Sequence, residues 1–147
     1  MKKILAVASG GGHWKQLMLL SPAFEGCNVK YITTIEGLPE QEGIENYRIV
    51  KDSNKDEKLS LLVTLTQIFI IVIKYRPDFV ISTGAAPGLL AIILGRLLGA
   101  KTLWVDSIAN GEELSMAGRL AKKCSNKVLS QWGALADDIV EHEGAVY

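Results

Sequence analysis

The stretch that decides the fold class of this chain is FVISTGAAPG at residues 79–88. It begins with a short apolar run that predicts a buried strand, and a turn follows at Thr83-Gly84-Ala85-Ala86. Pro87 then suits the first turn of a helix, where its missing N–H carries no penalty. The same order of strand, turn and helix opens the chain and recurs along it, which predicts a parallel sheet covered by helices on both faces.

The sequence on both sides of this unit predicts one α/β domain. No repeat, low-complexity tract or linker divides residues 1–147, so we expect a single doubly wound, Rossmann-like sheet. The apolar runs predict strands at residues 4–8, 29–33, 47–50, 79–82, 102–106 and 127–130. The helical patterns predict helices at residues 14–21, 59–74, 87–98, 114–124 and 135–141.

Composition narrows the class of protein. Sixteen basic and sixteen acidic residues balance, which does not favour a nucleic-acid-binding protein. Cys27 and Cys124 lie far apart, with no metal-ligand spacing, as in a reduced intracellular chain. The amino-terminal apolar run is short and enters a glycine turn, so it predicts a first strand and not a signal peptide. We therefore expect the protein in the cytoplasm or on the cytoplasmic face of a membrane.

A glycine loop, Ser9-Gly10-Gly11-Gly12-His13, follows the first predicted strand. Consecutive glycines let the backbone approach a ligand and leave N–H groups free to face an anion at a helix start. The loop matches neither the dinucleotide nor the phosphate-loop fingerprint. His13 places an imidazole at the sheet edge, where it can take a proton from a hydroxyl nucleophile. The alternative is that His13 caps the helix or packs against Trp14.

Two further polar clusters end predicted strands, at Ser82-Thr83-Gly84 and at Asp106-Ser107. Ligands of doubly wound sheets bind beyond the carboxyl ends of the strands, so we expect these clusters to meet the glycine loop in one crevice. A carboxylate at Asp106 could orient His13, bind a sugar hydroxyl or act as the base. The alternative is that Asp106 caps the following turn with Ser107 and Asn110.

The helix predicted at Leu59–Ile73 is apolar over most of its circumference. Its fifteen residues reach roughly 22 Å, which is shorter than the ~30 Å hydrocarbon core, so it is not expected to span a membrane. Burial against the sheet accounts for one face of this helix but not for the opposite one, which should be polar if water covers it. We expect that face to contact a membrane or a partner protein.

Four stretches together resemble a known family: residues 9–13, residues 77–88, Trp104-Val105-Asp106-Ser107 and Ser130-Gln131-Trp132. The chain resembles the membrane-associated, acceptor-side subunits of two-component glycosyltransferases. That family includes the anchor subunit of the dolichol-linked UDP-N-acetylglucosamine transferase and bacterial subunits of capsule and exopolysaccharide synthesis, which use undecaprenyl-pyrophosphate carriers. The resemblance covers nearly the whole chain.

The resemblance implies the fold of the amino-terminal domain of a GT-B glycosyltransferase. A separate catalytic partner would bind the UDP-sugar, and transfer to the lipid-pyrophosphate-linked sugar would be inverting, without metal or cofactor. By the same resemblance, His13 is the general base and Asp106 orients it or the acceptor. Residues expected to face the acceptor pyrophosphate are Gly10, Gly11, Gly12, Thr83, Gly84 and Ser107, and those expected to border the partner are Gln131 and Trp132.

One departure concerns membrane attachment. Eukaryotic members carry an amino-terminal membrane-spanning segment, whereas this sequence opens directly on a strand. We therefore expect a bacterial-type member with an undecaprenyl acceptor, attached peripherally to the cytoplasmic face of the cell membrane through Leu59–Ile73. Two alternatives stay open: a non-catalytic scaffold that only recruits and activates the catalytic partner, and a self-sufficient nucleotide-binding enzyme.

Overall fold

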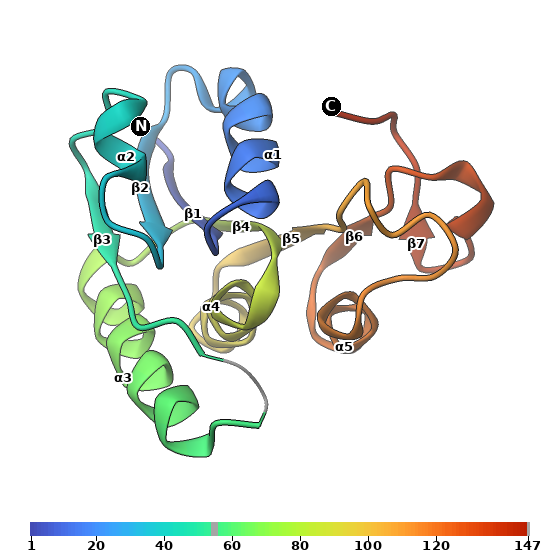
Figure 1. The fold of residues 1–147 in the computed structure, drawn as a ribbon. Coiled ribbons are helices and arrows are strands. Elements are labelled where there is room, and N and C mark those ends of the chain that lie inside the picture. Colours follow the sequence, from blue (N-terminus) through green and yellow to red (C-terminus); the bar gives the residue numbers. More distant parts are fainter. Residues whose placement is uncertain (54–55, 147) are drawn as a thin grey trace.

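The computed structural model describes residues 1–53 and 56–146. Its centre is one parallel sheet with strand order β3-β2-β1-β4-β5-β6-β7 (Figure 1). The strands are β1 (Lys3–Ala8), β2 (Asn28–Thr33), β3 (Tyr47–Ile49), β4 (Phe79–Gly84), β5 (Lys101–Val105), β6 (Lys127–Leu129) and β7 (Val140–Glu141).

Helices cover both faces of the sheet, which confirms the predicted doubly wound class. On one face lie α3 (Lys58–Tyr75), α4 (Ala85–Leu97) and α5 (Met116–Cys124) (Figure 1). The other face carries α1 (Gly12–Leu20) and the short 3-10 helix η1 (Ser21–Phe24), while α2 (Leu38–Gln41) joins β2 to β3. A second 3-10 helix, η2 (Gly133–Leu135), follows β6.

The apolar run of β1 is buried because it feeds two cores. Leu5 and Val7 pack with residues of α3 and α4, such as Ile68 and Ile92. Their neighbours on the strand, such as Ala6, point to the other face and pack with α1. Successive strand residues face opposite sides, so a strand covered on both faces needs a continuous apolar sequence.

The predicted helix at residues 135–141 is wrong. The chain there forms η2 and then β7, which pairs in parallel with β6. The carboxylate of Asp137 accepts hydrogen bonds from the backbone N–H of Ile139 at 2.8 Å and of Val140 at 2.7 Å. This local bonding offers the backbone an alternative to the helical pattern, and the chain becomes the edge strand.

The strand order reverses between β1 and β4, and this reversal places the site. From β1 the chain moves outward to β2 and β3, and α3 then returns it to β4 on the other side of β1. The loops that leave β1 and β4 therefore start side by side and diverge to opposite faces of the sheet. Such a switch point opens a crevice at the carboxyl ends of the strands.

Candidate functional site

The loops after β1 and β4 interlock at this switch point through His13 and Thr83. Nδ1 of His13 lies 3.1 Å from the backbone oxygen of Thr83. In return the Thr83 hydroxyl donates to the backbone oxygen of His13 at 2.6 Å. The structure thus brings the glycine loop and the Ser82-Thr83-Gly84 turn together, as the sequence predicted.

Gly84 makes this contact possible. A Cβ atom at Gly84 would overlap the imidazole of His13, and the backbone there has φ of 149°, which side chains disfavour. The N–H of Gly84 donates to the hydroxyl of Ser82 at 3.1 Å. The next residue, Ala85, has φ of 72°, a left-handed conformation that costs a non-glycine residue about 1–2 kcal/mol. Backbone strain of this kind is concentrated at functional sites.

Two helices begin at this switch point without a side-chain cap. The residues before α1 and α4 are Gly11 and Gly84, and neither helix has an acidic side chain in its first turn. The first N–H groups of a helix have no partner within it, and the helix dipole adds positive potential at that end. Paired uncapped amino ends suit an anion such as a pyrophosphate.

In the rest of the glycine loop, Gly10 lies against a side chain, whereas Gly11 and Gly12 are exposed. A Cβ at Gly10 would overlap the side chain of Ile35, which covers the loop from the segment after β2. Gly11 and Gly12 are exposed, and Gly11 has φ of 68°. The loop therefore presents its backbone to solvent at Gly11 and Gly12.

Asp106 lies at the same edge of the sheet, but its carboxylate makes its hydrogen bonds within its own segment of the chain. It is 2% exposed, and its Oδ1 accepts from Trp104 Nε1 at 3.0 Å and from the Ser115 hydroxyl at 2.7 Å. Its Oδ2 accepts from Ser115 N at 3.0 Å and from Asn110 Nδ2 at 3.4 Å. Within the described residues no hydrogen bond joins Asp106 to His13. The carboxylate therefore fixes the segment between β5 and α5.

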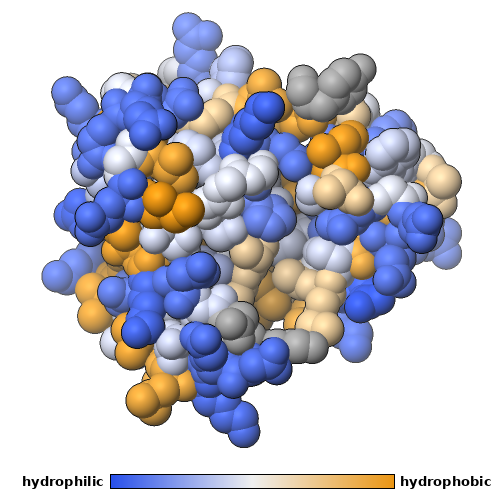
Figure 2. All heavy atoms as spheres, in the orientation of Figure 1, coloured by the Kyte–Doolittle hydropathy of each residue, from blue (hydrophilic) through white to orange (hydrophobic). Residues whose placement is uncertain are grey.

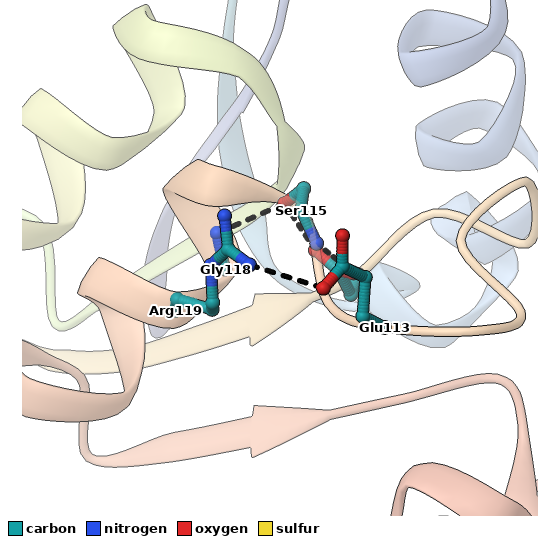
Figure 3. Close-up of polar contacts among 5 residues, drawn as sticks. Glu113, Ser115, Gly118 and Arg119 are labelled. Atoms are coloured by element: carbon teal, nitrogen blue, oxygen red, sulfur yellow. Dashed lines mark hydrogen bonds and ion pairs between the residues drawn. The ribbon is translucent and has the colours of Figure 1, made fainter.

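Ser115 completes this anchor by capping α5. Its hydroxyl accepts from the N–H of Gly118 at 2.9 Å, beside an ion pair of Arg119 with Glu113 at 3.2 Å (Figure 3). A serine in this position satisfies one of the amide groups that a helix start leaves unpaired. Unlike α1 and α4, α5 thus has a filled amino end.

A buried amide network links the remaining predicted residues, and sequence reasoning missed its centre, Gln16. The Gln16 Nε2 donates to the Ser107 hydroxyl at 3.1 Å, and its Oε1 accepts from Gln131 Nε2 at 2.5 Å. Gln131 Nε2 also donates to the backbone oxygen of Asp106 at 3.0 Å. A polar residue between the buried Trp14 and Leu17 of α1 was the available signal, since buried amides need partners.

The two residues expected at a partner interface differ in exposure. Gln131 is 5% exposed and acts inside the chain, where its Oε1 also accepts from the N–H of Val146 at 2.7 Å. Trp132 is 43% exposed, and its Nε1 donates to the backbone oxygen of Ile108 at 2.7 Å. Of these two residues, only Trp132 has its side chain at the surface.

A hollow of about 580 Å³ in the molecule does not lie at the switch point. It lies at the opposite edge of the sheet, between the ends of α3 and α4, and Lys2, Arg76 and Lys101 line it. In residues 1–53 and 56–146, no three His, Cys, Asp or Glu side chains group so that they could hold a metal ion. The convergence of loops, and not a large pocket, identifies the switch point as the candidate site.

The outer face of α3 is apolar. Thr64, Ile68 and Val72 face inward and are buried, while the exposed apolar residues on α3 are Leu59, Leu62, Val63, Phe69, Ile70 and Ile73. Figure 2 shows apolar side chains gathered at the surface over this helix, at the lower left. At 18 residues α3 is longer than the predicted Leu59–Ile73, so the expectation that this helix is too short to span a membrane does not hold: by length and composition alone it is long and apolar enough to cross one.

Several solved structures superpose on nearly the whole chain. MurG of Acinetobacter baumannii superposes with a TM-score of 0.82 at 14% identity, over 100% of this chain and 47% of MurG. A UDP-N-acetylglucosamine 2-epimerase from Rickettsia bellii gives 0.72 at 12% identity, over 99% and 45%. A glycosyltransferase from Rickettsia africae gives 0.69 at 16% identity, over 97% and 42%.

These likenesses show the fold, which is that of one domain of GT-B-type proteins. The chain spans less than half the length of each of these three structures. No protein-family model matches the chain, and no curated protein matches its sequence.

Proposed function

We propose that the chain is the acceptor-binding subunit of a heteromeric glycosyltransferase. It would hold an undecaprenyl-pyrophosphate-linked sugar while a partner holds the UDP-sugar, in bacterial capsule or exopolysaccharide synthesis. The observation that carries the proposal is the convergence of His13 with two uncapped helix amino ends at the switch point of a GT-B-type domain. A base beside an anion site is what a hydroxyl nucleophile on a pyrophosphate carrier requires.

The reaction assigns His13 a defined proton. A hydroxyl oxygen of the acceptor sugar attacks the anomeric carbon of the donor as its proton passes to His13. The bond from that carbon to UDP breaks, and UDP leaves with the electron pair, so the configuration inverts. The amide groups at the starts of α1 and α4 hold the acceptor pyrophosphate, with Gly11 and Gly12 allowing close approach.

Asp106 contributes by position in this scheme. Its carboxylate is engaged by Trp104, Asn110 and Ser115, so it holds the β5–α5 segment. Ser107 is tied to Gln16, one helical turn beyond His13 in α1. Both residues therefore support the acceptor wall of the crevice, and His13 remains the proposed base.

An open groove on the sheet supports a partner that supplies the sugar-nucleotide domain. On the α1 side, side chains of β4, β5 and β6 line a groove of about 490 Å³ together with residues 143–146. Its walls include Ile81, Leu103 and Leu129. Parallel sheets are normally covered on both faces, so apolar side chains here favour an apolar segment of the partner as the cover. Trp132 would extend that contact.

The outer stripe of α3 supports peripheral attachment to the cytoplasmic face of the cell membrane. Six exposed apolar side chains on one helix form a larger patch than isolated surface residues do. Lys58 and Lys74 are exposed at the two ends of the helix, where they would meet anionic head groups. The inner face packs in the core, which favours a helix lying on the membrane surface.

Reconstitution tests the proposal. The chain is co-expressed with the product of the adjacent gene, and the purified complex is given UDP-sugars with an undecaprenyl-pyrophosphate-linked acceptor in vesicles. We expect co-purification and UDP release that depends on both proteins and on the acceptor. Full activity of the partner alone, or tight binding of a nucleotide by the isolated chain, would contradict the proposal. Full activity of complexes with His13 or Asp106 replaced would favour the non-catalytic scaffold.

A further inference from the structure

We infer that Thr83 is a positioning residue that holds His13 as the Nδ1-protonated tautomer, which leaves Nε2 as the proton acceptor. The tautomer is a property of this chain alone and can be measured without a partner. Its catalytic consequence rests on the proposed function, in which His13 is the base.

The first step concerns the proton on Nδ1. The atom facing Nδ1 of His13 at 3.1 Å is a backbone carbonyl oxygen, which accepts hydrogen bonds and cannot donate them. The contact is therefore a hydrogen bond only when Nδ1 carries the proton. A neutral imidazole has one N–H, so Nε2 then holds the lone pair.

The second step concerns the hold on His13. Thr83 is 0% exposed, and its hydroxyl donates to the backbone oxygen of His13 at 2.6 Å. The same residue thus binds both the backbone and the ring of His13, and it fixes the start of α1 against the end of β4. The bare backbone of Gly84 provides the room for the ring.

The third step concerns the proton transfer itself. When Nε2 takes the proton of the acceptor hydroxyl, both ring nitrogens become donors. The oxygen of Thr83 continues to accept from Nδ1, so the imidazolium forms without rearrangement. Among the described residues Nε2 of His13 has no hydrogen-bond partner, which leaves it available to substrate.

Nitrogen-15 NMR of the folded chain tests the tautomer directly. The chain contains two histidines, and His13→Gln identifies the signals of His13 by their loss. At a pH at which the ring is neutral, long-range proton–nitrogen correlations should show a protonated Nδ1 and an unprotonated Nε2. A ring protonated on Nε2 in the unaltered chain would overturn the inference.

The role of Thr83 is tested with Thr83→Val, with Thr33→Val as the matched control. Thr33 is another fully buried threonine at a strand end, and its hydroxyl has no hydrogen-bond partner within the described residues. Valine keeps the backbone oxygen of Thr83 but loses the hydroxyl that ties the start of α1 to the end of β4. Because the ring is then held less firmly against that oxygen, Thr83→Val should lower the Nδ1-protonated fraction and reduce kcat of the complex by about tenfold with KM little changed. Thr83→Ser should restore both quantities, and Thr33→Val should change neither.

The outcomes separate this inference from the proposed function. An unchanged His13 tautomer and kcat in Thr83→Val would overturn the positioning role. If Thr83→Val fails to fold, Thr83→Ser and the unaltered chain still decide, because an Nε2-protonated ring in either contradicts the geometry. Absence of sugar transfer by the complex would contradict the proposed function and leave the NMR result standing.

Discussion

Two regions at one edge of the sheet differ in how their polar groups are engaged. Where the loops of β1 and β4 meet, His13 has Nδ1 bonded, Nε2 has no partner among the described residues, and both helix starts lack caps. In the β5–α5 segment, four donors surround Asp106 and Ser115 caps α5. Position at the carboxyl edge is therefore insufficient to identify a functional residue, and unsatisfied hydrogen-bonding capacity distinguishes the candidate site from the β5–α5 segment.

The largest effect should come from closing the space beside His13. Gly84→Ala adds a Cβ that overlaps the imidazole, at a backbone conformation that alanine disfavours. We expect kcat of the complex to fall by at least about 100-fold, the range associated with loss of a general base. Gly99→Ala is the control, because Gly99 also has positive φ but open space around it. Wild-type turnover of Gly84→Ala would contradict the contrast between the two regions.

Asp106→Asn should act mainly on stability. The change removes a negative charge that four donors stabilise, and it presents an amide to some of them. Because hydrogen bonds to charged groups contribute about 1.5–3 kcal/mol, we expect urea unfolding to show a loss of about 2 kcal/mol. The exposed Asp138→Asn should be neutral. Unchanged stability together with abolished turnover would show that Asp106 has a catalytic role and not a structural one.

A similar contrast exists between the two faces of α3. Its inner face packs against the core, whereas the apolar side chains on its outer face are exposed. Phe69→Ser combined with Ile70→Ser should weaken binding to anionic phospholipid vesicles by at least about tenfold. A tenfold loss corresponds to about 1.4 kcal/mol, which is less than the full burial of one such apolar side chain contributes. Unfolding free energy should change by less than about 1 kcal/mol. Ile139→Ser, at an exposed position outside α3, should leave vesicle binding unaltered. Equal loss in both variants would show that the α3 stripe has no special role.

The smallest effect concerns a second carboxylate that is engaged by its own segment. Hydrogen bonds from the N–H groups of Val140 and Ile139, and from Lys122, lower the pKa of Asp137 to about 2. The folded-state pKa is below the ordinary value of 3.8, so this contribution is present above that pH and is lost as the pH falls toward 2. Asp137→Asn should flatten the decline of unfolding free energy between about pH 4 and pH 2. An unaltered decline would contradict the assigned bonds.

The features that could be predicted from the sequence are those set by where strands end and where glycine turns follow them. Because parallel strands end at one edge, the loop of His13 and the turn at Thr83-Gly84 could be expected to meet, and they do. The order of strands around β1 then places this meeting at the switch point. Such features depend on backbone topology, which short apolar runs and turns encode locally.

Other features depend on side-chain contacts between distant segments. The partners of Asp106 include Ser115, nine residues further along the chain, and the buried amides of Gln16 and Gln131 meet across 115 residues. At residues 135–141, the carboxylate of Asp137 bonds the backbone and overrides a helical pattern. Periodicity does not report such bonds, because they depend on rotamers and on which strands become neighbours.

The most direct measurement of the central claim is the turnover of the reconstituted complex with His13→Gln. If His13 is the base, kcat should fall by at least about 100-fold while the complex still assembles and binds the lipid-linked acceptor with similar KM. Turnover within about twofold of the unaltered complex would contradict the assignment of His13 as the base and leave the chain as a support for its partner.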